Sequence, residues 1–154
     1  MSFLSSIIVV EDVLRSRQLY EKIMGMKVTE DHGIYNVGLE GGLSLYQREL
    51  FQNLTGGLQV QTKSNSVVLY FEVEDLESME KAILQAGFEF VHRIQEQPWK
   101  QKNFRFYDCD GHINEVAETM SVVCRRLVDE GKSVQEIADF TNYTIEKVNE
   151  LLGI

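Results

Sequence analysis

An internal repeat constrains this 154-residue sequence more than any other feature. The tripeptide Val10-Glu11-Asp12 recurs as Val73-Glu74-Asp75, an offset of 75 − 12 = 63 residues. Each copy follows a strand-like apolar run and precedes apolar residues at helical spacing. Gly25 and Gly87 stand where the two predicted helices end, at an offset of 87 − 25 = 62. One structural unit used twice, with a single-residue deletion in the second copy, explains both offsets.

Each copy predicts one strand, one helix and three further strands, which is the pattern of an α+β fold. We expect the modules at about 1–52 and 66–118, joined by a polar, glycine-rich loop over 53–65. The expected helices span 12–24 and 75–86. The expected strands of the first copy span 5–11, 26–30, 33–39 and 43–48, and those of the second span 67–73, 88–93, 103–107 and 112–117.

Residues 119–154 form a helical tail with three predicted helices, over 120–130, 133–140 and 144–152. Ser133 and Glu136 have the spacing of a capping box, and Thr144 is a suitable N-cap for the last helix. Helices this short are marginal alone in water, so their apolar stripe must pack on something. We expect this stripe to pack on the sheet domain of its own or a partner chain: Ile137, Phe140, Ile145, Val148, Leu151 and Leu152.

Charge and composition exclude several classes of function. The formal net charge is -9, which disfavours binding to nucleic acid or to anionic membranes. The tail resembles a helix-turn-helix pair, but its balance of four basic to six acidic residues does not suit DNA. Cys109 and Cys124 lie in unlike contexts, which favours reduced thiols and a cytoplasmic location. No apolar run is long enough to span a bilayer, and no signal peptide is recognisable.

Three stretches carry a resemblance to a known family. They are Val10-Glu11-Asp12 running to Gly25, Phe71-Glu72-Val73-Glu74-Asp75-Leu76, and Pro98-Trp99 followed by the strand–turn–strand segment from Phe104 to Glu115. Together they make residues 5–118 resemble the glyoxalase, bleomycin-resistance and extradiol-dioxygenase superfamily, also called vicinal oxygen chelate proteins. Cys109 stands where that family usually has proline, and Asp110-Gly111 still supplies turn chemistry.

The resemblance implies two βαβββ modules that form a cupped mixed sheet. It also implies a metal site that takes a His or similar ligand from a module's first strand and a Glu from its last. Glu115 matches the last-strand position, but Val68 stands at its first-strand partner. Ser5 and the segment 44–46 occupy the corresponding places in the first module. Since a catalytic site needs about three protein ligands, we predict no metal and no other cofactor.

Glu115 and Arg105 are the first two candidate site residues, and each has two readings. Arg105 alternates with Phe104 and Phe106, so it points away from the face that packs those rings. It could bind an anionic group of a ligand, or it could pair with a glutamate. Glu115 could act as a base or bind a cationic group, or it could be the carboxylate that pairs with Arg105.

Three further candidates are Tyr70, Glu72 and Trp99. Strand alternation places Tyr70 and Glu72 on the face opposite Phe71. Trp99, the single tryptophan, precedes the Arg105 strand and could close over a ligand, although ordinary packing is the favoured reading because tryptophan is usually well buried.

The remaining reactive side chains give weaker signals. His32, His92 and His112 show no metal-ligand spacing, which favours structural roles for them. Asp108 and Asp110 flank Cys109 and should raise its pKa, which disfavours a nucleophilic thiol.

Two hypotheses from different classes remain open. The first is a homodimeric protein that binds a small organic molecule in a cup lined by Tyr70, Glu72, Arg105 and Glu115, without the usual metal. The second is a metal-dependent lyase or isomerase of the glyoxalase I type, in which a divalent metal polarises vicinal oxygens. A weaker third idea is a regulator that senses a ligand in the cup and signals through the tail.

Overall fold

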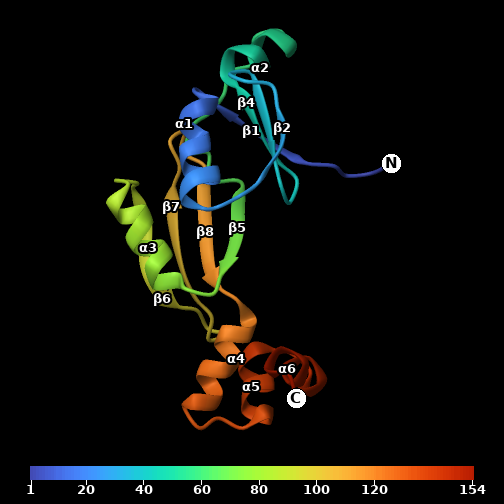
Figure 1. The fold of residues 1–154 in the computed structure, drawn as a ribbon, viewed down its shortest axis with the longest axis vertical. Helices are drawn as coiled ribbons and strands as arrows, with labels where there is room; N and C mark the ends of the chain where they lie inside the picture. The colour runs from blue at the N-terminus through green and yellow to red at the C-terminus, as the bar shows by residue number, and fades with distance from the viewer. The chain divides into compact units, whose positions relative to one another are not determined.

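The computed structural model describes all 154 residues (Figure 1), and the chain divides into two compact units. The first unit comprises Met1–Val67 together with Tyr107–Ile113. The second comprises Val68–Phe106 together with Asn114–Ile154. The turn of the last β-hairpin therefore belongs to the first unit, and the helical tail belongs to the second. No helix combines the length and the apolar composition that crossing a membrane requires.

The first unit contains a four-stranded mixed sheet with the strand order β1-β4-β3-β2. β1 runs parallel to β4, while β3 pairs antiparallel with β2 and with β4. The predicted first helix is confirmed as α1 followed by a π-helical segment, η1. The Asp12 side chain caps α1 by accepting from the backbone N–H groups of Leu14 and Arg15. The elements are β1 (Ser6–Val10), α1 (Val13–Arg17), η1 (Gln18–Ile23), β2 (Val28–Asp31), β3 (Asn36–Leu39), β4 (Leu43–Gln47) and α2 (Arg48–Leu54).

Two predictions for the first unit were wrong in detail. The strand expected over 33–39 begins only at Asn36, because Gly33 lies in a turn with φ 66°. The loop expected from residue 53 is preceded by α2, which no prediction included. The Gln47 side chain caps this helix by accepting from the backbone N–H of Leu50, and glutamine is not among the usual capping residues.

The second unit repeats the same topology, as the sequence repeat predicts. Its sheet has the order β5-β8-β7-β6, so the first strand again lies beside the last. Asp75 caps the helix by accepting from the backbone N–H of Ser78, and Gly87 follows it with φ 81°. The elements are β5 (Val68–Val73), α3 (Leu76–Gln85), β6 (Phe90–Glu96), β7 (Lys102–Tyr107) and β8 (Ile113–Glu118).

The second sheet has one apolar face and one open face. Phe104 and Phe106 are fully buried, and their rings lie within 6.4 Å of the Phe90 ring centroid. An irregularity in β6 changes its register, so that Phe90 lies opposite Phe106 but His92 lies opposite Arg105. We call the other side, which bears the predicted site residues, the open face: Tyr70, Glu72, His92, Asn103, Arg105 and Glu115.

The tail folds into three helices with their own core: α4 (Met120–Asp129), α5 (Val134–Thr141) and α6 (Ile145–Leu152). The predicted capping box of Ser133 and Glu136 is confirmed. Part of the apolar stripe expected to pack on a sheet packs inside the tail instead, where Ile137 and Val148 are fully buried against α4. The residues of this core are Val123, Cys124, Leu127, Ile137, Ala138 and Val148, with Leu151 and Leu152 packed against it.

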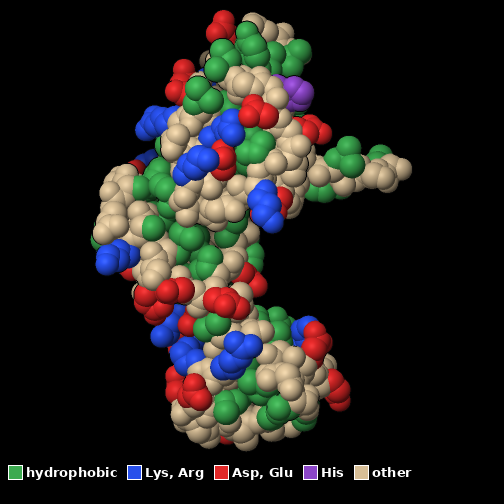
Figure 2. All heavy atoms as spheres, in the orientation of Figure 1, with side chains coloured by type: hydrophobic (Ala, Val, Ile, Leu, Met, Phe, Trp, Pro, Cys, Tyr) green, Lys and Arg blue, Asp and Glu red, His purple; other side chains and the backbone are tan.

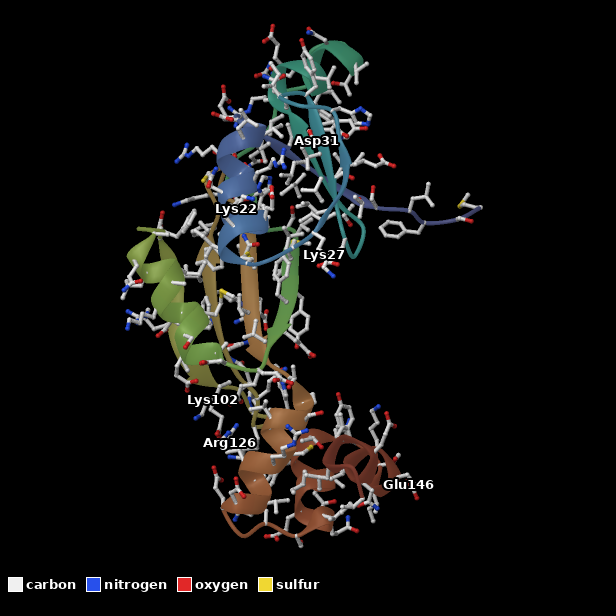
Figure 3. The ribbon with its side chains drawn as sticks, viewed as in Figure 1. Lys22, Lys27, Asp31, Lys102, Arg126 and Glu146 are labelled. Atoms are coloured by element: carbon white, nitrogen blue, oxygen red, sulfur yellow. The ribbon has the colours of Figure 1, made fainter.

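A polar contact joins the tail to the second sheet. Arg126 projects from α4 (Figure 3). It donates to the backbone oxygen of Lys100 at 2.6 Å and pairs with the buried Glu118 carboxylate at 3.0 Å. Glu118 also accepts from the backbone N–H of Lys102 at 2.8 Å.

On the visible face of the tail, Figure 2 shows acidic and basic side chains interspersed rather than one continuous basic surface.

Candidate functional site

Arg105 and Glu115 form the centre of the open face. The Arg105 Nε and Nη2 atoms lie 2.8 and 2.7 Å from Glu115 Oε2. Asn103, two residues earlier on β7, donates from Nδ2 to Glu115 Oε1 at 2.6 Å. Both oxygens of this largely buried carboxylate therefore have donors within the second sheet. Of the two readings of Glu115, the structure contains the one in which it pairs with Arg105.

His92 extends this network on the neighbouring strand. Its Nε2 atom lies 2.9 Å from Arg105 Nη1, and its Nδ1 atom lies 2.9 Å from the backbone oxygen of Arg93. Because a guanidinium can only donate, Nε2 must accept, and the ring proton belongs on Nδ1. Gln97 donates to Asn103 Oδ1 at 2.8 Å and orients that amide. The network thus holds the Arg105 side chain in place and leaves two of its N–H bonds without a partner.

Tyr70, Glu72 and Trp99 are the exposed candidates, and a buried glutamine connects them. The Gln101 side chain donates from Nε2 to the Tyr70 hydroxyl at 2.9 Å, and its Oε1 accepts from the Trp99 indole N–H at 2.8 Å. Gln101 is only 4% exposed and also donates to the backbone oxygen of Glu118 at 2.7 Å. One amide group therefore fixes the polar atoms of two aromatic side chains, which remain 51% (Tyr70) and 39% (Trp99) exposed.

Tyr70 keeps its proton over the whole physiological range. The pKa of Tyr70 is raised to about 12, with burial as the main cause; the hydrogen bond from Gln101 opposes this shift, and the Glu72 and Glu115 carboxylates contribute to it. The hydroxyl therefore donates to Glu72 Oε1, at 2.8 Å. This arrangement presents a ring, a neutral hydroxyl and a carboxylate on one strand of the open face.

The residues at the family's metal positions do not fit a metal. Both oxygens of Glu115 already accept from Asn103 and Arg105, and the Arg105 guanidinium would repel a cation beside them. The apolar, exposed Val68 side chain offers no ligand atom. The structure contains no group of three or more His, Cys, Asp and Glu side chains that could hold a metal ion.

The corresponding positions of the first module are two serines. The Ser44 hydroxyl donates a hydrogen bond to the Ser5 hydroxyl, and the two oxygens lie 3.3 Å apart. Both line a hollow of about 390 Å³ on the first sheet, together with Thr29, Asn36 and Tyr46. A second hollow of about 570 Å³ lies beside α1 and α2 and contains none of the predicted site residues. Serine hydroxyls are weak ligands for a divalent metal, so these two positions do not supply the family's metal-ligand pair.

The turn within the family-like segment Phe104 to Glu115 stabilises the first unit. The buried Asp108 carboxylate accepts from the Tyr20 hydroxyl and from His112 Nδ1, both at 2.8 Å, and from two backbone N–H groups of its own turn. Asp110 accepts from the backbone N–H of Glu11 at 2.8 Å. Gly111 has φ 86° and approaches the Lys63 backbone so closely that a Cβ would clash. The aspartates and the glycine of this turn therefore have a structural role.

Four side chains of this turn have shifted pKa values, among them Asp110, whose pKa is raised mainly by burial. Burial is the largest single cause for both groups and opposes the charged forms of Asp108 and His112. Their mutual hydrogen bond and Coulombic attraction, together with smaller contributions, outweigh it, so the Asp108 pKa is lowered and the His112 pKa is raised. Burial is the main cause that raises the pKa of the Cys109 thiol, with smaller contributions from Asp108 and Asp110. The predicted direction for Cys109 is confirmed, but its main cause is burial rather than charge.

The structure brings four predicted residues together on the open face: Tyr70, Glu72, Arg105 and Glu115. Trp99 is joined to them through Gln101. Sequence reasoning missed Asn103, although its position two residues before Arg105 implies the same face. It also missed the contact of His92, because the irregularity in β6 changes the alternation. No local pattern identifies Gln101, since its role depends on two side chains from different elements.

Two βαβββ modules with the same strand order define the fold of glyoxalase-related proteins. The family model described as a glyoxalase-like domain matches residues 3–121, which is most of the chain. The chain belongs to this family, and the predicted superfamily is confirmed. The match ends in the first turn of α4, so the rest of the tail lies outside it. None of the curated proteins matches this chain.

Solved structures support the same fold. A protein of unknown function from Agrobacterium tumefaciens str. C58 has 32% identity and a TM-score of 0.69, with 77% of this chain and 94% of that chain covered. Hypothetical protein SA1046 from S. aureus has 22% identity and a TM-score of 0.67 over the same shares of the two chains. A glyoxalase-related enzyme from Fulvimarina pelagi has 18% identity and a TM-score of 0.63, with 75% and 88% covered.

Proposed function

We propose that this protein binds a small organic molecule on the open face of its second sheet, without the metal chemistry of its superfamily. The ligand would lie against Tyr70 and Trp99, within reach of Glu72 and of the free N–H bonds of Arg105. Aromatic rings supply contact area, and a few fixed polar groups supply orientation, which is the usual composition of a small-molecule site.

One observation carries this proposal. Glu115, the residue at the family's metal-ligand position, has both oxygens occupied by Arg105 and Asn103, while the adjoining aromatic side chains are exposed. Freeing the carboxylate for a metal would leave a positive guanidinium partly buried beside a cation. The same occupancy disfavours Glu115 as a general base, because a proton acceptor needs a free oxygen facing the substrate.

The alternative, a lyase or isomerase of the glyoxalase I type, requires that metal. A lactoylglutathione lyase from Agrobacterium tumefaciens shares the fold, with 12% identity and a TM-score of 0.56. Similarity at that level supports a common backbone and does not transfer an activity. The occupied Glu115 and the apolar Val68 favour binding over metal-assisted turnover.

Metal titration tests the proposal against this alternative. Isothermal titration of the metal-stripped full chain with Ni²⁺, Zn²⁺ and Mn²⁺ should show no site tighter than roughly micromolar, since one paired carboxylate provides little affinity. Glu115→Ala should leave any weak binding unchanged. Tight stoichiometric binding that Glu115→Ala abolishes would contradict the proposal and support the lyase alternative.

A further inference from the structure

The exposed aromatic pair has a fixed arrangement. Gln101 is held by the backbone oxygen of Glu118, so its amide cannot rotate without losing that bond. Tyr70 and Trp99 each bond to one end of this amide. Fixing both rings before a ligand arrives lowers the conformational entropy that binding must overcome. Exposed rings held in this way suit a flat ligand that contacts their faces.

The charges on the open face leave one carboxylate without a cationic partner. The Arg105 guanidinium is balanced by Glu115, and His92 occupies one further N–H of that guanidinium. Glu72 is exposed and accepts a hydrogen bond from the neutral Tyr70 hydroxyl, but no lysine or arginine of the second unit pairs with it. The face therefore carries one uncompensated negative charge, located beside the aromatic rings.

We infer that the ligand is a flat organic cation, with its ring against Tyr70 and Trp99 and its charge beside Glu72. This inference rests on the proposed function and specifies the ligand class of the same site. Aromatic faces attract cations through the negative potential above the ring, and a nearby carboxylate adds to that attraction. An anionic ligand would meet Glu72 and would find the Arg105 charge already neutralised by Glu115.

Three probes of one shape test the ligand class. Benzamidinium, benzamide and benzoate share a benzene ring with a small planar substituent and carry positive, zero and negative charge. Trp99 is the sole tryptophan, so its fluorescence reports on this site directly. Titrations of the full chain should show saturable binding of benzamidinium that is about tenfold tighter than that of benzamide, with benzoate the weakest.

A charge-matched pair of variants locates the effect. Glu72→Gln should weaken benzamidinium binding about fivefold and leave benzamide binding unchanged. Glu77→Gln removes one exposed carboxylate from the first turn of α3 and should change neither. Both positions are exposed, so both variants should fold, and circular dichroism verifies this.

Each other outcome overturns the inference. If benzamide or benzoate binds as tightly as benzamidinium and changes Trp99 fluorescence, the site binds small molecules but is not selective for cations. The proposed function then stands without this ligand class. An unchanged benzamidinium affinity in Glu72→Gln also overturns it, as does the absence of any response to all three probes. The metal titration decides the proposed function separately.

Discussion

The two sheets have one topology and two different chemistries. Each places its first strand beside its last, in the orders β1-β4-β3-β2 and β5-β8-β7-β6. The first sheet bears the hydroxyls of Ser5 and Ser44 around a polar hollow. The second bears the Arg105–Glu115 pair and two exposed aromatic rings. The comparison teaches that duplication preserves the backbone pattern, while the side chains on each open face determine what that face can bind.

The two regions also divide stability and binding between them. The turn Asp108 to His112 holds the first unit together through buried hydrogen bonds. The residues proposed to contact a ligand lie in the strands and the loop of the second unit. Substitutions in the turn should therefore change stability, and substitutions on the open face should mainly change binding.

The largest expected effect is that of Asp108→Ala. Four donors lose a buried charged acceptor, so the free energy of unfolding should fall by about 3 kcal/mol. Urea denaturation followed by circular dichroism measures the change. Asp129→Ala, at an exposed position of the tail, is the control and should stay within about 0.5 kcal/mol of the parent. Equal stability of the two variants would mean that the turn does not hold the first unit.

Arg126→Ala should have the next largest effect. Arg126 is the partner of the buried Glu118 and of the Lys100 carbonyl, so its loss should lower the free energy of unfolding by about 2 kcal/mol. The contact of the tail with the second sheet should weaken first, while the tail keeps its own core. The backbone N–H of Lys102 donates a hydrogen bond to Glu118, so its rate of hydrogen exchange measures the weakening of this contact locally. Unchanged exchange there would show that Arg126 does not order this junction.

Arg105→Ala should lower the free energy of unfolding by less, about 1 kcal/mol. Asn103 still donates to Glu115 in this variant, and the site is partly open to water. Benzamidinium binding should change more than stability does and should tighten, because loss of the guanidinium removes a positive charge and leaves Glu115 as a second uncompensated carboxylate. Thermal melts and the benzamidinium titration, performed on the same preparation, compare the two effects. A loss of several kcal/mol would instead make Arg105 a structural partner of a buried charge and would remove the distinction between the two regions.

The smallest expected effect is a pH dependence located in the turn. Because the pKa of His112 is raised in the folded protein, its contribution to the free energy of unfolding is complete below its ordinary pKa. That contribution is lost as the pH rises through the raised pKa. Because the pKa of Asp108 is lowered in the folded protein, its contribution to the free energy of unfolding is present above the ordinary aspartate pKa of about 3.9. That contribution is lost as the pH falls through the lowered pKa. The pair should therefore stabilise most between about pH 4 and 6.5.

Urea midpoints at pH 5 and pH 9 measure this effect in the parent and in His112→Gln. The parent should lose more stability at pH 9 than the variant does, by about 1 kcal/mol. Asp110, whose pKa burial raises, titrates in both proteins, so the difference isolates His112. Parallel losses in the two proteins would show that the His112–Asp108 contact adds no pH-dependent stability.

The sequence predicts those parts of the fold that depend on local rules. The repeated topology, the helix-ending glycines Gly25 and Gly87 and the capping box of Ser133 and Glu136 are all confirmed. The helix α2 was missed, because its cap is an untypical glutamine. The tail's own core was not predicted, because a periodic stripe identifies a buried face without identifying what covers it.

The candidate site divides in the same way. Strand alternation correctly put Tyr70, Glu72 and Arg105 on one face, because side chains of a regular strand alternate. It does not predict the contact of His92 with Arg105, because an irregularity in β6 changes the register. It could not find Gln101, whose hydrogen bonds to Tyr70 and Trp99 depend on contacts between separate elements.

Nuclear magnetic resonance of the isotope-labelled full chain tests most directly the claim that the second sheet carries the ligand site. Benzamidinium should shift the Trp99 indole N–H signal and the backbone signals of Tyr70, Glu72 and Arg105 in proportion to its occupancy. The signals of Ser5, Asn36 and Ser44 on the first sheet should stay in place. Saturable shifts that gather around those three residues, with the Trp99 indole signal unmoved, would contradict the account.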